Sequence, residues 1–175
     1  MYQVIYADPP WAYRNKNTGG SHRSGAAQKY PTLTPSEVAA LPVRALVTRP
    51  ATLWLWATAP LLPEILPVMA AWGFTYKTAI VWHKTGRKGL GYWFRGEAEF
   101  LFFGICGPVR AFRSSLPNVI AAPVAGHSCK PAAFRALIET YTPHQARVEL
   151  FARAHAPGWT CHGLESDGRD LRAAG

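Results

Sequence analysis

Short apolar runs separated by polar, Gly-rich or Pro-rich segments characterise this chain. Runs dominated by hydrophobic, β-branched and aromatic residues predict buried β-strands, because a strand covered on both faces loses the alternation of polar and apolar positions. Such runs cover residues 3–7, 51–57, 98–105, 118–122 and 148–152. Residues 74–82 alternate enough to predict one further strand.

Start and stop signals between these runs predict helices. The capping box Thr34-Pro35-Ser36-Glu37, with proline at the first helical position, predicts that a helix starts there. The apolar segment 60–72 is predicted to be helical, with a kink at Pro67 and an end at Gly73. A further helix is predicted over 130–141, opened by Lys-Pro.

Predicted strands alternate with predicted helices, which indicates the α/β class with a mainly parallel sheet. No repeat or linker divides the chain, so residues 1–175 are expected to form a single domain. The Gly-rich, basic segments 14–29 and 83–96 are predicted to be loops. Because ligands bind beyond the carboxyl ends of strands in such sheets, Asp8 and Arg153 become candidate site residues.

The charge of the chain predicts a polyanionic partner. Hydrophobic residues make up 49% of the chain and charged residues 17%, yet the formal net charge is +9. Nine cations that account for this excess lie in two segments without acids, and they are Arg14, Lys16, Arg23, Lys29, Lys77, Lys84, Arg87, Lys88 and Arg95. Nucleic acid is the commonest polyanion that such basic loops bind. A solvated charged surface is the alternative interpretation.

Cysteine content and the length of the apolar stretches argue against several other classes. Cys106, Cys129 and Cys161 include no close pair, so neither a disulfide framework nor a zinc site is expected, and a cytoplasmic location fits. Asp8 interrupts the early apolar run, which argues against an N-terminal signal. The apolar stretches are short and broken by proline, so no membrane span is expected.

Asp8-Pro9-Pro10-Trp11, directly after the first predicted strand, carries the strongest chemical signal. The amine of adenine is a poor nucleophile, because its lone pair is delocalised into the ring. A site that methylates it must accept its N–H hydrogens and hold the nitrogen in line with the methyl donor. Asp8 can accept one hydrogen, the carbonyl of Pro9 can accept the other, and Trp11 can offer a flat surface to an extruded base. A Pro turn with a core Trp is the alternative.

These four residues and several later segments resemble the DPPW-type N(6)-adenine methyltransferase family. The resemblance runs in order along nearly the whole chain, through Tyr30-Pro31-Thr32-Leu33, Leu53-Trp54-Leu55-Trp56-Ala57-Thr58, Trp72-Gly73-Phe74, Gly91-Tyr92-Trp93-Phe94-Arg95, Glu99, His127-Ser128-Cys129-Lys130-Pro131, Glu149-Leu150-Phe151-Ala152-Arg153 and Pro157-Gly158-Trp159. It implies an S-adenosylmethionine-dependent methyltransferase with a Rossmann-like fold. The motif order is permuted, because the target-amine motif precedes the cofactor-binding segments.

The resemblance also implies roles for single residues. Asp8 is expected near both the target amine and the methionyl part of the cofactor. Lys130 is expected to bind the cofactor carboxylate, and a fixed cation suits that role. Arg153 and His155 are expected to line the ribose and its surroundings, and Glu165 falls at a polar ribose contact. Solvated surface positions are the alternative for these last four residues.

Substrate contacts are expected from Trp11 and from the two basic loops. Tyr30 falls where the resemblance suggests a contact with the target adenosine, with core packing as the alternative. Lys84, Arg87, Lys88 and Arg95 are expected to grip the phosphate backbone around the extruded adenine; the full substrate set is therefore Trp11, Tyr30, Lys84, Arg87, Lys88 and Arg95.

Two features of the sequence qualify these expectations. Leu164 stands after Gly163 where the family usually has Asn, so one ribose contact is expected to be lost or replaced by a backbone group. Glu99 either holds a loop near the site by pairing with a basic residue or only begins a strand.

The expected function is transfer of a methyl group from S-adenosylmethionine to the 6-amino group of adenine in nucleic acid, with DNA favoured over RNA as the substrate. DNA is favoured because a compact chain without an accessory RNA-binding domain is similar to the bacterial and phage members. An RNA adenosine methyltransferase and a catalytically silent nucleic-acid-binding paralogue are the alternatives. Relatives often pair, so a homo- or heterodimer is a further expectation.

Overall fold

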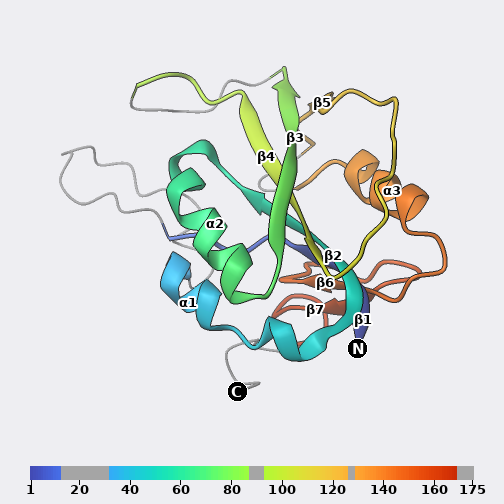
Figure 1. Ribbon diagram of the computed structural model, residues 1–175. Helices are drawn as coiled ribbons and strands as arrows, with labels where there is room; N and C mark the ends of the chain where they lie inside the picture. Colours follow the sequence, from blue (N-terminus) through green and yellow to red (C-terminus); the bar gives the residue numbers. More distant parts are fainter. Residues whose placement is uncertain (13–31, 87–92, 126–128, 169–175) are drawn as a thin grey trace.

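A seven-stranded sheet in the order β5-β3-β4-β2-β1-β6-β7 forms the centre of the protein (Figure 1). The computed structural model describes residues 1–12, 32–86, 93–125 and 129–168. The strands are β1 (Tyr2–Ala7), β2 (Val47–Ala57), β3 (Thr75–Thr85), β4 (Ala98–Cys106), β5 (Val119–Pro123), β6 (Arg147–Leu150) and β7 (Thr160–His162). Only β4 runs antiparallel to its neighbours β2 and β3, while every other pairing is parallel. The predicted α/β class with a mainly parallel sheet is therefore confirmed.

Helices cover both faces of this sheet (Figure 1). α1 (Pro35–Ala40) and α2 (Leu62–Ala71) contribute apolar side chains to one hydrophobic core cluster, and α3 (Ala132–Tyr141) contributes Phe134 and Ile138 to the other. Two short 3-10 helices, η1 (Val43–Leu46) and η2 (Ala59–Leu61), precede β2 and α2. The described part of the chain contains no helix with the length and apolar character needed to cross a membrane.

Local signals explain where the helices begin and end. The capping box at α1 is formed, because the Thr34 hydroxyl accepts from the N–H of Glu37 while the Glu37 carboxylate accepts from the Thr34 N–H at 2.7 Å. Pro67 lies inside α2, and Gly73 after its end adopts a φ of +85°, a left-handed conformation that glycine reaches without steric cost. Both predicted helix positions are confirmed.

Several predicted boundaries were wrong. Residues 83–85, expected in a loop, continue β3, and β6 ends at Leu150 rather than at residue 152. The strand β7 was missed, since three residues carry too little pattern to predict a strand. Its backbone is nevertheless fixed by parallel pairing with β6. The predicted loop 14–29 lies outside the described residues.

The reversed direction of β4 brings its start to the edge where β1, β3 and β6 end. Glu99, near the start of β4, pairs with Trp82 near the end of β3. Lys84 therefore lies at the same edge, and its backbone N–H donates to Glu97 O at 2.7 Å. Acidic and basic side chains from strands far apart in sequence thus meet beside Asp8.

Substitution of Gly163 by Ala should destabilise the fold strongly. A Cβ at this position would lie 2.2 Å from Ala152 O and 2.6 Å from Ala152 N, and backbone atoms cannot yield as a flexible side chain can. We expect Gly163→Ala to lower the free energy of unfolding by about 3 kcal/mol or more. Gly96→Ala, where no atom lies within 4 Å, is the matched control and should leave it within about 0.5 kcal/mol. Urea denaturation measures both, and equal stability of the two variants would refute the assigned contact.

Candidate active site

Asp8 sits on a short segment that hydrogen bonds fix directly after β1. Its backbone N–H donates to Leu150 O at 3.5 Å. The Pro10 carbonyl accepts from the N–H of Leu33 at 2.8 Å, and the Leu33 carbonyl accepts from the N–H of Ala12 at 2.7 Å. The segment is therefore anchored on both sides, and the Asp8 carboxylate projects from a fixed backbone.

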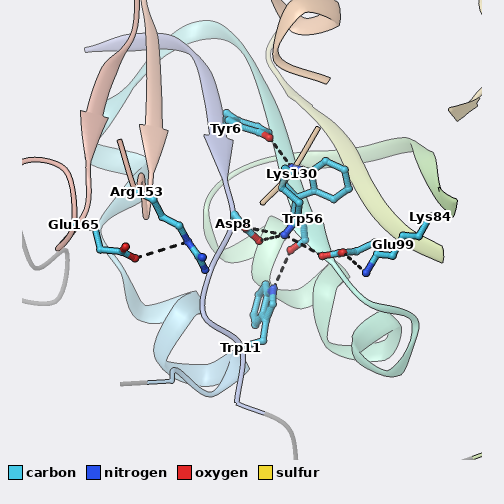
Figure 2. Close-up of polar contacts among 9 residues, drawn as sticks. All are labelled: Tyr6, Asp8, Trp11, Trp56, Lys84, Glu99, Lys130, Arg153 and Glu165. Atoms are coloured by element: carbon cyan, nitrogen blue, oxygen red, sulfur yellow. Dashed lines mark hydrogen bonds and ion pairs between the residues drawn. The ribbon is translucent and has the colours of Figure 1, made fainter. Parts of the chain in front are cut away.

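Trp11 anchors the same segment from inside the protein. Its indole N–H donates to the carbonyl of Trp56 at 2.8 Å, and only 7% of the residue is exposed (Figure 2). The expectation that Trp11 offers a flat surface to an extruded base does not match this placement, because core side chains cover the ring. Trp11 instead holds the Asp-Pro-Pro segment against β2.

Four charged side chains of alternating sign meet beside this segment (Figure 2). The ammonium of Lys130 lies 2.8 Å from both carboxylate oxygens of Asp8 and 3.0 Å from Oε1 of Glu99. The other oxygen of Glu99, Oε2, lies 2.8 Å from Nζ of Lys84. This ionic network of Asp8, Lys130, Glu99 and Lys84 connects the segment after β1 with β3, β4 and the segment before α3.

The pairing outweighs the cost of burying these charges. Burial alone would raise the pKa of Glu99, but Lys130 and then Lys84 hold it below its usual value. Burial alone would lower the pKa of Lys130, but Asp8 and Glu99 raise it above its usual value. Both groups therefore carry full charge at neutral pH.

Lys130 has no spare hydrogen-bond donor in this arrangement. An ammonium has three N–H bonds, and the three neighbouring carboxylate oxygens of Asp8 and Glu99 match them in number. Its Nζ also lies 5.2 Å from the centre of the Trp56 ring. Binding a cofactor carboxylate, the predicted role of Lys130, would thus require it to release one of these protein oxygens.

A cavity of about 160 Å³ opens beside Asp8 and Lys130, at the carboxyl ends of β1 and β6. Arg135 and Glu149 pair in its wall through a short contact between Nη2 and Oε2. Burial raises the pKa of Glu149, although Arg135 opposes the shift. The Nε of Arg135 is buried without a partner among the described residues. Such a lining of cations and carboxylates suits the ammonium and carboxylate of an amino acid.

Sequence reasoning missed these two wall residues and Tyr6. Tyr6 accepts a hydrogen bond from the indole of Trp56 at 2.8 Å, and burial raises the pKa of its phenol (Figure 2). A signal for Glu149 was available, since it belongs to the Glu-Leu-Phe-Ala-Arg segment that the resemblance includes. No local pattern marks Arg135, whose position depends on how α3 packs.

Of the predicted ribose contacts, Arg153 alone is among the described residues that line this cavity. Arg153 lines it, and its Nε lies 3.8 Å from Oε1 of Glu165, with about two fifths of each side chain exposed (Figure 2). His155 is exposed nearby in the sequence, and Leu164 is 52% exposed. The structure thus brings Arg153 and Glu165 together next to the Asp8 motif, with Leu164 turned to solvent.

The predicted phosphate contacts are only partly supported. The Lys84 ammonium is paired with Glu99 and lies 5.0 Å from the centre of the Trp82 ring, and its phosphate contact stays a prediction. The carboxylate of Glu99, on the neighbouring strand β4, already balances the charge of Lys84. Arg95 is exposed, as a phosphate contact requires. Tyr30, Arg87 and Lys88 lie outside the described residues.

Comparison with known proteins gives a consistent family match. The sequence profile of the MT-A70 family matches residues 2–165. The type II methyltransferase M.MunI of Mycoplasma sp is 34% identical over 94% of this chain and 77% of its own length. The human N(6)-adenosine-methyltransferase catalytic subunit METTL3 is 29% identical over 97% of this chain, and a Drosophila melanogaster N(6)-adenosine-methyltransferase MT-A70-like protein is 29% identical over 95%. The chain spans less than a third of the length of these two animal relatives, at 29% and 27%.

Replacing Glu99 by Gln should remove a stabilisation that depends on pH. Because the folded-state pKa of Glu99 lies below the usual 4.5, its stabilisation is present above that value and is lost as the pH falls through the folded-state pKa. At pH 7 we expect Glu99→Gln to lower the free energy of unfolding by about 2 kcal/mol. The difference from the parent should shrink between about pH 5 and pH 3.

Denaturant titrations at several pH values measure this difference. The matched control is Glu97→Gln, two residues away, where 39% of the side chain is exposed and Nε2 of His83 lies 4.0 Å from the carboxylate. A Glu99→Gln effect that is independent of pH, or no larger than that of the control, would contradict the assigned pairing.

Proposed function

The chain belongs to the MT-A70 family of S-adenosylmethionine-dependent adenine methyltransferases, and from this premise we propose that Asp8 and Pro9 receive the 6-amino group of an adenine in nucleic acid. The observation that carries the proposal is the Asp8 carboxylate, which Lys130 fixes beside a cavity suited to an amino acid end group. Target amine and methyl donor can therefore meet at one side chain.

The Asp-Pro-Pro segment can orient the amine without activating it covalently. A carboxylate has about four lone-pair directions, and Lys130 uses two contacts on Asp8, so acceptor capacity remains for an adenine N–H. The carbonyl of Pro9 accepts from the N–H of Trp11 at 2.9 Å and keeps its second lone pair for the other hydrogen. Two fixed acceptors direct the nitrogen lone pair along one line.

The cavity residues fit the amino acid end of the cofactor. S-adenosylmethionine supplies an electrophilic sulfonium methyl group when it is bound. Arg135 and Arg153 supply cations for its carboxylate, and Lys130 joins them only when it releases one oxygen of Asp8 or Glu99. Glu149 is the carboxylate that lines the cavity for its ammonium. At about 160 Å³ the cavity is smaller than the roughly 300–1,000 Å³ of typical ligand pockets. We assign the ribose end to the Arg153–Glu165 pair, of which Arg153 lines the cavity.

DNA is the proposed substrate. Support comes from M.MunI, a type II methyltransferase with which the chain shares 77% of that enzyme's length, whereas the relatives named for adenosine share less than a third. The exposed Arg95 and the net charge of +9 suit a phosphate backbone. The human relative is named as a catalytic subunit, which supports the further proposal that this chain pairs with a second subunit.

Nucleoside mass spectrometry tests the proposed reaction and the role of Asp8 together. Incubation with S-adenosylmethionine and mixed DNA or RNA should yield N(6)-methylated adenine, and more in DNA. Asp8→Asn should reduce the rate by at least about 100-fold, because the neutral amide is a weaker acceptor and stabilises a developing cation less. The exposed variant Glu97→Gln is the matched control and should keep the parent rate.

Each outcome bears on a separate part of the proposal. Methylation of cytosine, or of no base, would contradict the assigned target. An Asp8→Asn rate within a few-fold of the parent would remove Asp8 from the mechanism even if adenine is the product. Methylation of RNA in preference to DNA would overturn the substrate assignment and leave the chemistry intact.

A further inference from the structure

A second and larger cavity lies at the other end of the sheet from the Asp8 motif. It measures about 550 Å³, within the range of ligand-binding pockets, and shares no lining residue with the cavity beside Asp8. Its floor is the first half of β3 and the second half of β4, and the segment 107–118 that joins β4 to β5 passes over it. Leu137 and Tyr141 of α3 close one side.

Aromatic rings form one wall of this second cavity. Phe112 stacks on the buried indole of Trp54, with ring centres 6.1 Å apart and planes 4° apart. Phe112 also stacks on Tyr141, at 5.0 Å and 26°. Phe103 completes the group at 5.5 Å from Phe112. Planar apolar groups add favourably to such arrays, because offset stacking satisfies both dispersion and ring electrostatics.

The backbone holds Phe112 in this position at a steric cost. Arg113, the next residue, adopts a φ of +52°. This is the left-handed region of backbone conformation, which residues other than Gly, Asn, Asp and His rarely adopt. Such conformations persist where the surrounding structure enforces them, and they concentrate at binding sites. This conformation directly follows Phe112, whose ring contacts both Trp54 and Tyr141.

The charge of the second cavity has one sign. Lys77 and Arg110 line it, and no carboxylate of the described residues does. Neither cation takes part in an ion pair with another described residue. Asn118 and Ser114 add polar groups to an otherwise apolar lining. An occupant that matches this surface has an apolar planar body and a negative group placed at its edge.

We propose that this second cavity binds a small planar aromatic molecule that carries an anionic group such as a carboxylate, sulfonate or phosphate. The ring lies against Phe103 and Phe112, and the anion pairs with Lys77 and Arg110. The second cavity is then a small-molecule site that is independent of the methyl-transfer site and of its cofactor.

Titration calorimetry with three matched naphthalene probes tests the chemistry of the second cavity. We expect the anionic 2-naphthoate to bind about tenfold or more tightly than the neutral 2-naphthalenemethanol, the effect of one charge-assisted contact. The cationic 2-naphthylmethylammonium should bind more weakly than either. Saturating S-adenosylmethionine should leave the affinity for 2-naphthoate unchanged. Equal binding of the three probes, or displacement of 2-naphthoate by S-adenosylmethionine, would overturn the proposal.

Variants of the exposed lining locate the probe. Lys77→Ala combined with Arg110→Ala should weaken 2-naphthoate about tenfold or more and bring it close to the neutral probe. Thr78→Trp should fill the space and abolish binding of both, with circular dichroism as the check on folding. The control Arg44→Ala removes an exposed cation outside the cavity and should leave the affinity for 2-naphthoate unchanged. An unaffected Lys77/Arg110 double variant, or a dimer in gel filtration that Thr78→Trp dissociates, would overturn the proposal.

Discussion

The Lys130 ammonium between two carboxylates is the interaction on which the site depends. Its side chain is 11% exposed, so it has lost most of its hydration, and only close counter-charges compensate for that loss. The cation also stabilises Asp8 and Glu99, because without it these two partly buried carboxylates would repel each other. Lys84 balances the remaining charge. The four residues come from distant parts of the sequence, so the completed fold is a precondition of the charge arrangement.

The fold satisfies this constraint through the reversed strand β4. Its direction places Glu99 at the edge where β1 ends, while Trp11 fixes the Asp-Pro-Pro segment from the core side. A rigid acceptor for the adenine amine and a polar cavity for the cofactor then lie next to each other. α3 links this edge to the aromatic cavity at the far end of the sheet, because Lys130 precedes the helix and Tyr141 ends it.

Much of this was predictable from the sequence, and the remainder depends on tertiary packing. Apolar runs predicted most strands, and the capping box predicted the start of α1. The chemistry of an adenine amine singled out Asp8. The pairing of Lys84 with Glu99 was not predictable, because adjacent strands rather than adjacent residues create it. Burial of Trp11 likewise follows from the position of β2. Sequence marks which side chains can do chemistry, and packing decides which of them are free.

The most direct test of the central ionic interaction is a set of unfolding free energies at pH 7 for Asp8→Asn, Glu99→Gln, both together, and both with Lys130→Met. The Asp8→Asn/Glu99→Gln double variant leaves a buried ammonium without these two counter-charges. Its free energy of unfolding should therefore fall by about 1 kcal/mol or more beyond the sum of the two single decreases. Adding Lys130→Met should recover stability, because it removes that charge and keeps a side chain of similar size. Additive single losses with no recovery on adding Lys130→Met would contradict the account.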